Sequence, residues 1–280
     1  GNPYEDASRQ AYGDNHRRFA LLGWAAARLA QGLDPRWQPE VAHAHDWHAA
    51  LAPAYLAFAP RSGRPRVGSV FTVHNLAYQG LFAPWHLPEL GLPPAAFSVN
   101  GLEYHGQLSF MKGGLVFADR ITTVSPTYAR EIQTPDQGFG LDGLLRHRAG
   151  VLSGILNAVD DQVWNPATDT LLPERFDVRR MGGKARCKAA LQEELGLAPK
   201  AGAPLFVVVS RLTEQKGLQL VLDGLDSLLE QGGQLALLGS GDAALEAAFR
   251  ERAAAAPRSV SVTLGYSEPL AHRLFGAGDV

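Results

Sequence analysis

Short apolar runs alternate with longer amphipathic segments along almost the whole chain. A run of four to eight apolar residues bounded by turn residues is typical of a strand in a parallel sheet, and apolar residues spaced three to four apart indicate a helix. The predicted strands cover residues 41–45, 67–74, 121–125, 152–157, 205–210, 234–238 and 259–264, and the predicted helices cover residues 15–31, 47–58, 107–118, 184–195, 213–230, 242–255 and 267–275, with one more beginning at 126. Strands that alternate with helices predict parallel sheets with right-handed crossovers.

A polar, irregular segment from residue 160 to about residue 183 interrupts this alternation. Such segments join domains, and 280 residues are enough for two of them. The sequence therefore predicts an α/β fold with two Rossmann-like, doubly wound parallel-sheet domains that face a cleft, residues 1–157 and 158–280. Residues 1–4 have the composition of a loop interior, and residues 278–280 resemble the start of a further strand. We therefore expect both domains to be incomplete, the first without its initial strands and the second without its C-terminal part.

Composition narrows the function classes. The net charge of −2 gives no reason to expect nucleic acid or an anionic membrane as a partner. No apolar stretch is long enough to span a bilayer, and no signal peptide opens the chain. The single cysteine, Cys187, excludes an internal disulfide and a thiolate zinc cluster and suits a reducing compartment. We expect a cytoplasmic protein.

Two cations follow the apolar run 205–209, Arg211 almost directly and Lys216 five residues later. If Thr213 caps the helix 213–230, Lys216 occupies position N3, where the helix dipole disfavours a cation by about 0.3–1 kcal/mol. An anion between the two cations and the free N–H groups of the helix would reverse the sign of that effect. We therefore expect a phosphate site here, and the alternative is two solvated loop cations.

The densest polar cluster is HAHDWH, which contains His43, His45, Asp46 and His48. Three imidazoles and a carboxylate suit a metal site, but binuclear metallohydrolases have the order H-x-H-x-D-H, and here the aspartate comes one position early. Asp46 also stands where the N-cap of the next helix belongs, and at the carboxyl end of a strand it is able to accept a sugar hydroxyl. All three interpretations remain open at this point.

His74 and Asn75 follow the next predicted strand and reach the same edge of the sheet. A neutral imidazole at that edge can exchange hydrogen bonds with a substrate hydroxyl, and the alternative is a histidine that a loop carbonyl satisfies. Asn157 ends the strand 152–157 and is expected to face the cleft. We count all three as candidate substrate contacts.

Residues 239–244 (GSGDAA) match G-x-G-x-x-A between a strand and a helix. The strand is not the first of its domain and no acidic residue ends the following strand, so a dinucleotide cofactor is not expected. Gly239 and Gly241 either let the backbone approach a nucleotide or form a tight turn. Tyr266 follows the strand 259–264, where it either stacks on a base or packs internally. The chain has no G-x-S-x-G elbow and no Walker lysine loop, which argues against a serine hydrolase and a P-loop NTPase.

Taken in order, these segments resemble the ADP-glucose-dependent family of bacterial glycogen synthases and plant starch synthases. The resemblance covers essentially the whole chain, and related sugar-nucleotide transferases do not share HAHDWH and TVHNLAYQG together. The matching segments are residues 20–24 (ALLGW), 43–55 (HAHDWHAALAPAY), 71–80 (FTVHNLAYQG), 122–131 (TTVSPTYARE), 154–160 (GILNAVD), 210–218 (SRLTEQKGL) and 231–242 (QGGQLALLGSGD).

The resemblance implies a GT-B architecture, with the donor on the second domain and an α-1,4-glucan primer near the first. It implies retaining transfer of glucose from ADP-glucose to the non-reducing end of the glucan, with no metal and no cofactor. Arg211 and Lys216 would hold the diphosphate and stabilise the leaving ADP. His74 and Asn157 would contact the donor glucose and its reaction centre, and Asp46 would orient sugar hydroxyls.

For the nucleoside, the resemblance implies that Tyr266 stacks on adenine and that Gly239, Gly241 and Asp242 lie close by. Tyr4 would lie near the donor. The family's lysine–glycine loop would precede residue 1, and its acidic E-x7-E region would follow residue 280. We therefore expect the chain alone to have little or no transferase activity. The alternatives are a metallohydrolase that uses the HAHDWH cluster and a non-catalytic sugar-nucleotide-binding fragment.

Overall fold

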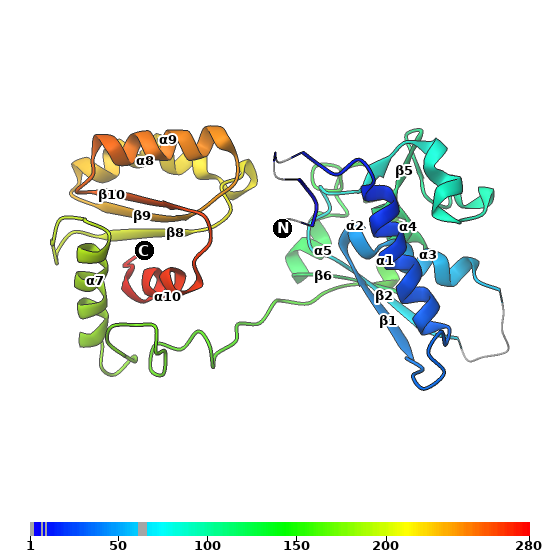
Figure 1. The fold of residues 1–280 in the computed structure, drawn as a ribbon, viewed down its shortest axis with the longest axis horizontal. Helices are drawn as coiled ribbons and strands as arrows, with labels where there is room; N and C mark the ends of the chain where they lie inside the picture. The colour runs from blue at the N-terminus through cyan, green and yellow to red at the C-terminus, as the bar shows by residue number, and fades with distance from the viewer. Residues whose placement is uncertain (1–2, 7, 9, 61–65) are drawn as a thin grey trace. The chain divides into compact units, whose positions relative to one another are not determined.

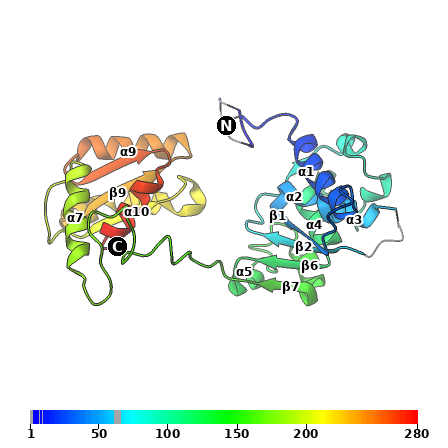
Figure 2. The same ribbon diagram turned by 60° about the horizontal axis from the view of Figure 1, so that its bottom comes forward.

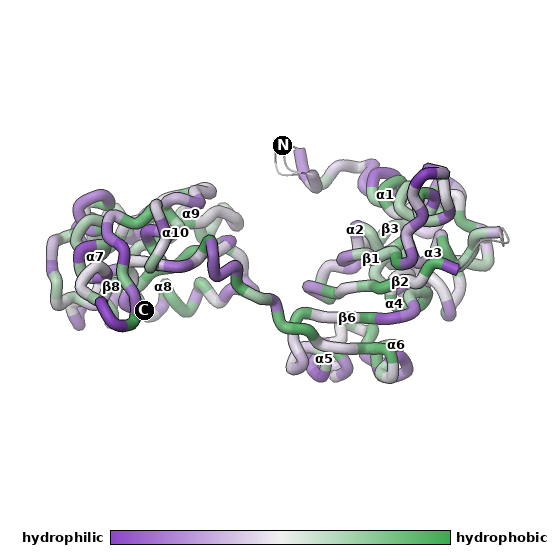
Figure 3. The backbone as a smooth tube through the Cα atoms, turned by 90° about the horizontal axis from the view of Figure 1, so that it is seen from below, coloured by the Kyte–Doolittle hydropathy of each residue, from purple (hydrophilic) through white to green (hydrophobic). Residues whose placement is uncertain are grey.

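The computed structural model describes residues 3–6, 8, 10–60 and 66–280, which form two compact units (Figure 1). Unit 1 comprises residues 1–158 and unit 2 comprises residues 159–280. The boundary predicted from the sequence lies after residue 157. Each unit is built around a parallel sheet (Figure 2), and hydrophobic and hydrophilic stretches alternate along both (Figure 3).

The sheet of unit 1 has the parallel order β1-β2-β6-β7. Its strands are β1 (Val41–His45), β2 (Gly68–Val73), β6 (Arg120–Thr123) and β7 (Leu152–Gly154). Three helices, α1 (Asn15–Ala30), α3 (Leu51–Phe58) and α4 (Phe110–Phe117), share one hydrophobic core with β2 and β6. The close fit of this core shows at Gly114, where a Cβ atom would lie 2.7 Å from the Phe71 ring.

Shorter elements complete unit 1. The helices are α2 (Asp46–Ala49), α5 (Pro126–Glu131) and α6 (Asp142–His147), the 3-10 helices are η1 (Pro84–Leu90), η2 (Pro94–Ala96) and η3 (Ala149–Val151), and the strands β3 (Leu81–Phe82), β4 (Glu103–Tyr104) and β5 (Gln107–Ser109) form an antiparallel sheet. The helix predicted for 107–118 was wrong in its first turn, because residues 107–109 pair with β3 and β4. The strand predicted for 152–157 ends at Gly154.

Unit 2 has the parallel order β10-β9-β8. Its strands are β8 (Leu205–Val209), β9 (Gln234–Gly239) and β10 (Val260–Leu264), and its helices are α7 (Gly182–Glu194), α8 (Leu218–Glu230), α9 (Ala243–Ala255) and α10 (Glu268–Ala277). Helices α8 and α9 cover one face of the sheet, and α7 and α10 cover the other (Figure 1). The side chains of β9 alternate between these two cores, so all six of its residues are buried.

The apolar run of β8 is only partly buried. Only Leu205 is fully buried, and the other four residues of β8 are half-buried. The reason is that β8 is an outer strand of the three, and on its other side, among the residues that the structure describes, it bonds only to residues 279 and 280. The Asp279 N–H donates to Leu205 O at 2.8 Å and the Val207 N–H donates to Val280 O at 2.9 Å.

The long helix predicted to start at Thr213 was also wrong. Residues Glu214–Lys216 form a 3-10 turn, η4, and α8 begins only after Gly217, whose φ is 66°. Thr213 makes no cap hydrogen bond with its side chain. Lys216 therefore closes a short turn two residues before α8, and the dipole argument for position N3 does not hold. No helix in the described ranges has both the length and the apolar composition needed to cross a membrane.

Candidate active site

The carboxyl ends of β1 and β2 bring Asp46 and His74 together. The two strands are parallel, with His45 opposite Thr72, so the residues after them reach the same edge of the sheet. Asp46 Oδ1 accepts hydrogen bonds from the His74 N–H at 2.8 Å and the Asn75 N–H at 3.4 Å. The prediction that Asp46 caps the next helix was wrong, since its carboxylate bonds across the strands and α2 has no side-chain cap.

The backbone of Asp46 is strained. Its φ is 52°, in the left-handed region, which a residue with a Cβ atom adopts at a cost of about 1–3 kcal/mol. Only His105 and Phe139 share this property among the non-glycine residues of the described ranges. Such strain clusters at functional sites, because only the surrounding contacts hold the residue in place.

Three imidazoles lie in a row beside Asp46. The ring centroids of His43 and His45 are 4.2 Å apart, and His45 Nδ1 lies 3.0 Å from His74 Nε2. Burial lowers the pKa of His45, and its neighbours His43 and His74 lower it further, although Asp46 opposes them. The His45 ring is therefore neutral at neutral pH. The nitrogen of each ring that does not take part in the contact between His45 and His74 stays available for other groups.

His48 does not belong to this row. Its ring packs against Trp47 at 4.1 Å, Tyr4 at 4.7 Å and Phe19 at 4.9 Å between centroids, and burial lowers its pKa. Within the residues that the structure describes, the HAHDWH side chains do not form a group whose ligand atoms all lie within 4.8 Å of one another. The geometry gives no support to the metallohydrolase alternative.

The loop that carries His74 is held by a residue that sequence reasoning missed. The Tyr128 hydroxyl accepts the Leu76 N–H at 2.9 Å, and Asn75 Oδ1 accepts the Ala77 N–H at 3.0 Å. Tyr128 stands on α5, whose N-cap Ser125 accepts the Tyr128 N–H at 2.8 Å. The only signal in the sequence was the match of residues 122–131 to the family, which assigned Tyr128 no role.

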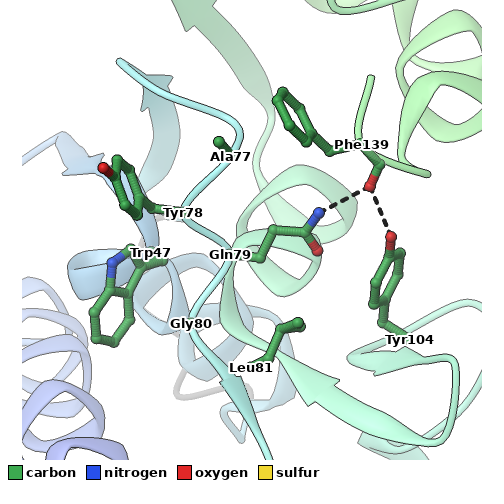
Figure 4. Close-up of a pocket in the computed structure, with 8 residues that line it drawn as sticks. All are labelled: Trp47, Ala77, Tyr78, Gln79, Gly80, Leu81, Tyr104 and Phe139. Atoms are coloured by element: carbon green, nitrogen blue, oxygen red, sulfur yellow. Dashed lines mark hydrogen bonds between the residues drawn. The ribbon is translucent and has the colours of Figure 1, made fainter. Parts of the chain in front are cut away.

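A pocket of about 560 Å³ opens beside this loop (Figure 4). Half of its lining residues are aromatic, and the lining comprises Trp47, Ala77, Tyr78, Gln79, Gly80, Leu81, Tyr104 and Phe139. The Phe139 carbonyl, on a residue with φ of 46°, accepts Gln79 Nε2 at 2.9 Å and the Tyr104 hydroxyl at 2.7 Å. Gln79 Oε1 is buried and has no hydrogen-bond partner within the described part of the chain. Sequence reasoning did not identify this pocket, because residue 139 joins it from a distant loop.

In unit 2 the carboxyl ends of the three strands meet around a tight turn. The Leu212 N–H donates to Ser240 O at 2.9 Å, and the Gly265 N–H donates to Gly239 O at 3.0 Å. These bonds hold Arg211, the turn 239–241 and Tyr266 at one edge of the sheet. A Cβ atom on Gly239 would lie 1.9 Å from the Ser210 carbonyl oxygen. The glycine is therefore required by backbone packing, which favours the tight-turn interpretation.

The candidate donor residues differ in their surroundings. Arg211 and Lys216 are exposed, and neither forms an ion pair with any residue that the structure describes. Asp242 caps α9, because its Oδ1 accepts the Ala244 N–H at 2.8 Å and the Leu245 N–H at 3.1 Å. Tyr266 is 85% exposed, so the packing alternative for this ring was wrong.

The remaining candidates lie in unit 1. Tyr4 packs on the rings of His48 and Phe19. Asn157 is exposed in the segment after β7 and does not lie on a strand. Among the candidate residues, the structure thus connects Asp46 to His74 and Asn75 by direct hydrogen bonds.

Residues 1–147 match the family model of the starch synthase catalytic domain. The chain is 77% identical to the glycogen synthase of Variovorax paradoxus (strain S110), covering 100% of this chain and 57% of that protein. For the glycogen synthase of Leptothrix cholodnii the identity is 63%, covering 100% and 58%. The chain thus spans less than two thirds of the length of these relatives.

Among solved structures, the catalytic domain of starch synthase IV from Arabidopsis thaliana, bound to ADP and acarbose, matches with a TM-score of 0.89 and 32% identity. The match covers 97% of this chain and 56% of that one. It confirms the prediction of an α/β fold of the GT-B type with two Rossmann-like units. With more than half of its residues matched by the family model, this chain belongs to the starch synthase catalytic-domain family.

Proposed function

We propose that this chain carries donor- and acceptor-binding residues of a glycogen synthase, which transfers glucose from ADP-glucose to the non-reducing end of an α-1,4-glucan with retention of configuration. The observation that carries the proposal is the pair Arg211 and Lys216, two exposed cations without ion-pair partners in the described ranges, which follow a parallel strand. Parallel α/β sheets bind their ligands at the carboxyl ends of the strands.

The chemistry needs those cations. When the bond between glucose C1 and the phosphate oxygen breaks, negative charge builds on the departing ADP. A guanidinium and an ammonium group offset that charge, so the proposed step requires neither a metal nor another cofactor. The acceptor 4-hydroxyl attacks C1 from the side that the phosphate leaves, and its proton passes to the departing phosphate oxygen. No nucleophile from the protein takes part.

Unit 1 would supply the sugar contacts. The imidazole of His74, held by the Asp46 carboxylate through its backbone N–H, would bond donor hydroxyls together with Asn75 and Asn157. Asp46 itself would orient hydroxyls through its second oxygen. Tyr4 would lie near the donor.

The pocket of Figure 4 would hold the glucan primer. Aromatic faces pack on the C–H faces of sugar rings, and Gln79 lines the same pocket, where a small rotation of its side chain would turn the unpartnered Oε1 towards a sugar hydroxyl. The ADP and acarbose bound to the Arabidopsis enzyme agree with a nucleotide site and a carbohydrate site. Tyr266 would stack on adenine beside Gly239, Gly241 and Asp242. We place the protein in the cytoplasm, where its single cysteine would remain reduced.

Isothermal titration calorimetry with ADP and ADP-glucose tests the proposal. Arg211→Ala and Lys216→Ala should each weaken ADP binding about tenfold or more, because each removes a charge-assisted contact of about 1.5–3 kcal/mol. Arg250→Ala, an exposed arginine on α9, serves as the control and should bind ADP like the wild type. Equal affinity in all four proteins would refute the donor site.

A glucan-incorporation assay then separates the enzyme from the alternative of a binding fragment. We expect the 280-residue chain to bind ADP-glucose with little or no turnover. Full turnover by this chain would contradict that expectation while supporting the transferase assignment. Competition between ADP and UDP would establish the nucleotide preference.

A further inference from the structure

His16, His86 and Glu89 come together in unit 1 from two elements distant in sequence. His16 is the second residue of α1, and His86 and Glu89 stand three positions apart on η1. Side chains three apart on a 3-10 helix lie on the same face, so both reach α1. Within the described ranges, no other group of three or more His, Cys, Asp or Glu side chains has all its ligand atoms within 4.8 Å of one another.

One carboxylate connects the two imidazoles. His16 Nε2 lies 3.0 Å from Glu89 Oε2, His86 Nδ1 lies 3.1 Å from Glu89 Oε1, and the two ring centroids are 3.8 Å apart. Three hydrogen bonds, from Arg17, His16 and His86, lower the pKa of Glu89 to about 2.

We propose that His16, His86 and Glu89 bind one divalent transition-metal ion, with Zn²⁺ as the best match, in a site that joins α1 to η1. Two imidazole nitrogens and a carboxylate oxygen are ligands that Zn²⁺ prefers, and three protein ligands leave a position for water. Tetrahedral Zn²⁺ with bonds of about 2.0–2.1 Å holds its ligand atoms about 3.3–3.4 Å apart. Each histidine nitrogen lies 3.0 or 3.1 Å from one of the two Glu89 oxygens, and one ligand atom from each of the three residues lies within 4.8 Å of the others, so small side-chain movements would reach that spacing.

The surroundings suit a structural ion. The His16 side chain is 6% exposed and fixed by packing, whereas the side chains of His86 and Glu89 are 26% and 32% exposed, so a water molecule would complete the coordination of an ion that joins the two elements. A neutral histidine carries its proton on either ring nitrogen, so each ring can offer the facing nitrogen to the ion without a change of charge. Such an ion would stabilise unit 1 whether or not the chain has the proposed function.

Two features of the site disfavour a bound cation, and the second of them can be removed by a substitution. The positive end of the α1 dipole weakly disfavours a cation. Arg17 Nε also donates to Glu89 Oε2 at 2.5 Å, so the guanidinium competes for the same oxygen. The Arg17 side chain is 65% exposed and is able to turn into solvent when the ion binds. Removing this competitor should therefore raise the affinity.

The experiment is a titration of the apo chain with Co²⁺, whose visible absorption reports nitrogen and oxygen coordination, followed by displacement with Zn²⁺. We expect one equivalent to bind. Glu89→Gln and His86→Ala should each weaken binding at least tenfold, and Arg17→Gln should strengthen it about tenfold. His147→Ala, an exposed histidine at the end of α6, is the matched control. Zn²⁺ should raise the melting temperature of the wild type and leave that of Glu89→Gln unchanged.

Three results would overturn the proposal. The first is the absence of a Co²⁺ spectrum, and the second is binding that His43→Ala abolishes while Glu89→Gln does not. The third is an Arg17→Gln affinity no higher than that of the wild type. This last variant retains all three ligands, so it decides the question even if Glu89→Gln or His86→Ala fails to fold.

Discussion

Asp46 Oδ1 accepts a 2.8 Å hydrogen bond from the His74 N–H and thereby ties together the carboxyl ends of two parallel strands. The aspartate makes this bond from a left-handed backbone conformation, with φ of 52°. A strained residue thus fixes the backbone of the histidine proposed to contact the donor sugar. The same acceptor reaches the Asn75 N–H, so both side chains of the loop are positioned from one carboxylate.

Three substitutions at Asp46 should separate the contribution of its hydrogen-bond acceptor from the cost of its strained backbone. Asn keeps an acceptor oxygen and tolerates φ > 0, so Asp46→Asn should change the free energy of unfolding of unit 1 least. Asp46→Gly relieves the strain but leaves the N–H groups without their acceptor, at a cost of about 1–3 kcal/mol. Asp46→Ala should cost about 1–2 kcal/mol more than Gly. Urea unfolding followed by tryptophan fluorescence measures the series, and an Ala variant as stable as the Gly variant would contradict the strain argument.

Tyr128 should position the loop that carries His74. Tyr128→Phe removes the acceptor of the Leu76 N–H and should destabilise unit 1 by about 1–2 kcal/mol. Burial raises the pKa of Tyr128, so the hydroxyl stays neutral throughout the useful pH range. Tyr266→Phe is the control for stability, because that ring is exposed and its hydroxyl donates to Glu268 Oε2 at 3.3 Å on the surface. If the denaturant midpoint moved by the same amount in Tyr128→Phe and Tyr266→Phe, the Tyr128 hydroxyl would not stabilise the loop that carries His74.

The order and type of the main elements could be predicted from sequence because apolar periodicity records which face of each element is buried. For β9, with cores on both sides, this gave a strand with nearly its observed bounds. The helix predicted from residue 213 was wrong because Gly217 permits a left-handed break that periodicity does not register. Residues 107–109 were assigned to a helix because strands of two or three residues are too short to show a periodic pattern, whether they pair nearby, as with β4, or with a distant segment, as with β3.

The candidate site was predictable only in part, for a similar reason. Parallel strands bring their carboxyl ends together, so Asp46 and His74 could be placed at one edge from the pattern alone. The hydrogen bond between them could not be predicted, because it requires a left-handed backbone conformation at Asp46 for which the sequence carries no signal. Gln79 and Phe139 were missed since their contact joins loops that are 60 residues apart.

Gly239 should be required for the placement of Arg211. In Gly239→Ala the new Cβ would lie 1.9 Å from Ser210 O, on the residue that precedes Arg211, so the backbone must shift. We expect unit 2 to lose about 2–3 kcal/mol, as for other overpacked sites, and ADP affinity to fall at least fivefold. Gly224→Ala is the matched control, because its Cβ meets nothing within 4 Å in the middle of α8. That variant should gain about 0.5–1 kcal/mol and bind ADP normally.

The stability of unit 1 should rise with pH through the range of histidine titration. Burial lowers the pKa of both His45 and His48, so between those lowered values and the unfolded value of about 6.5 the unfolded chain binds more protons than the folded one. The free energy of unfolding therefore falls as the pH drops through about 6.5 and is constant above it. Urea midpoints measured from pH 5.5 to 8 test this, and His48→Phe should flatten the profile. A profile of unchanged slope would show that His48 does not contribute.

Gln79 should contribute more to glucan binding than to stability. Its buried Oε1 has no partner within the described residues, which costs about 1–3 kcal/mol, whereas its Nε2 bond to Phe139 O contributes about 0.5–1.5 kcal/mol. Gln79→Met keeps the volume and removes both groups, so the free energy of unfolding should stay level or rise. Binding of a maltooligosaccharide, followed by calorimetry, should weaken at least fivefold. Tyr104→Phe, which removes the other donor to Phe139 O but keeps the ring, should destabilise the pocket without that selective loss. Unchanged maltooligosaccharide affinity in Gln79→Met would exclude the pocket as the primer site.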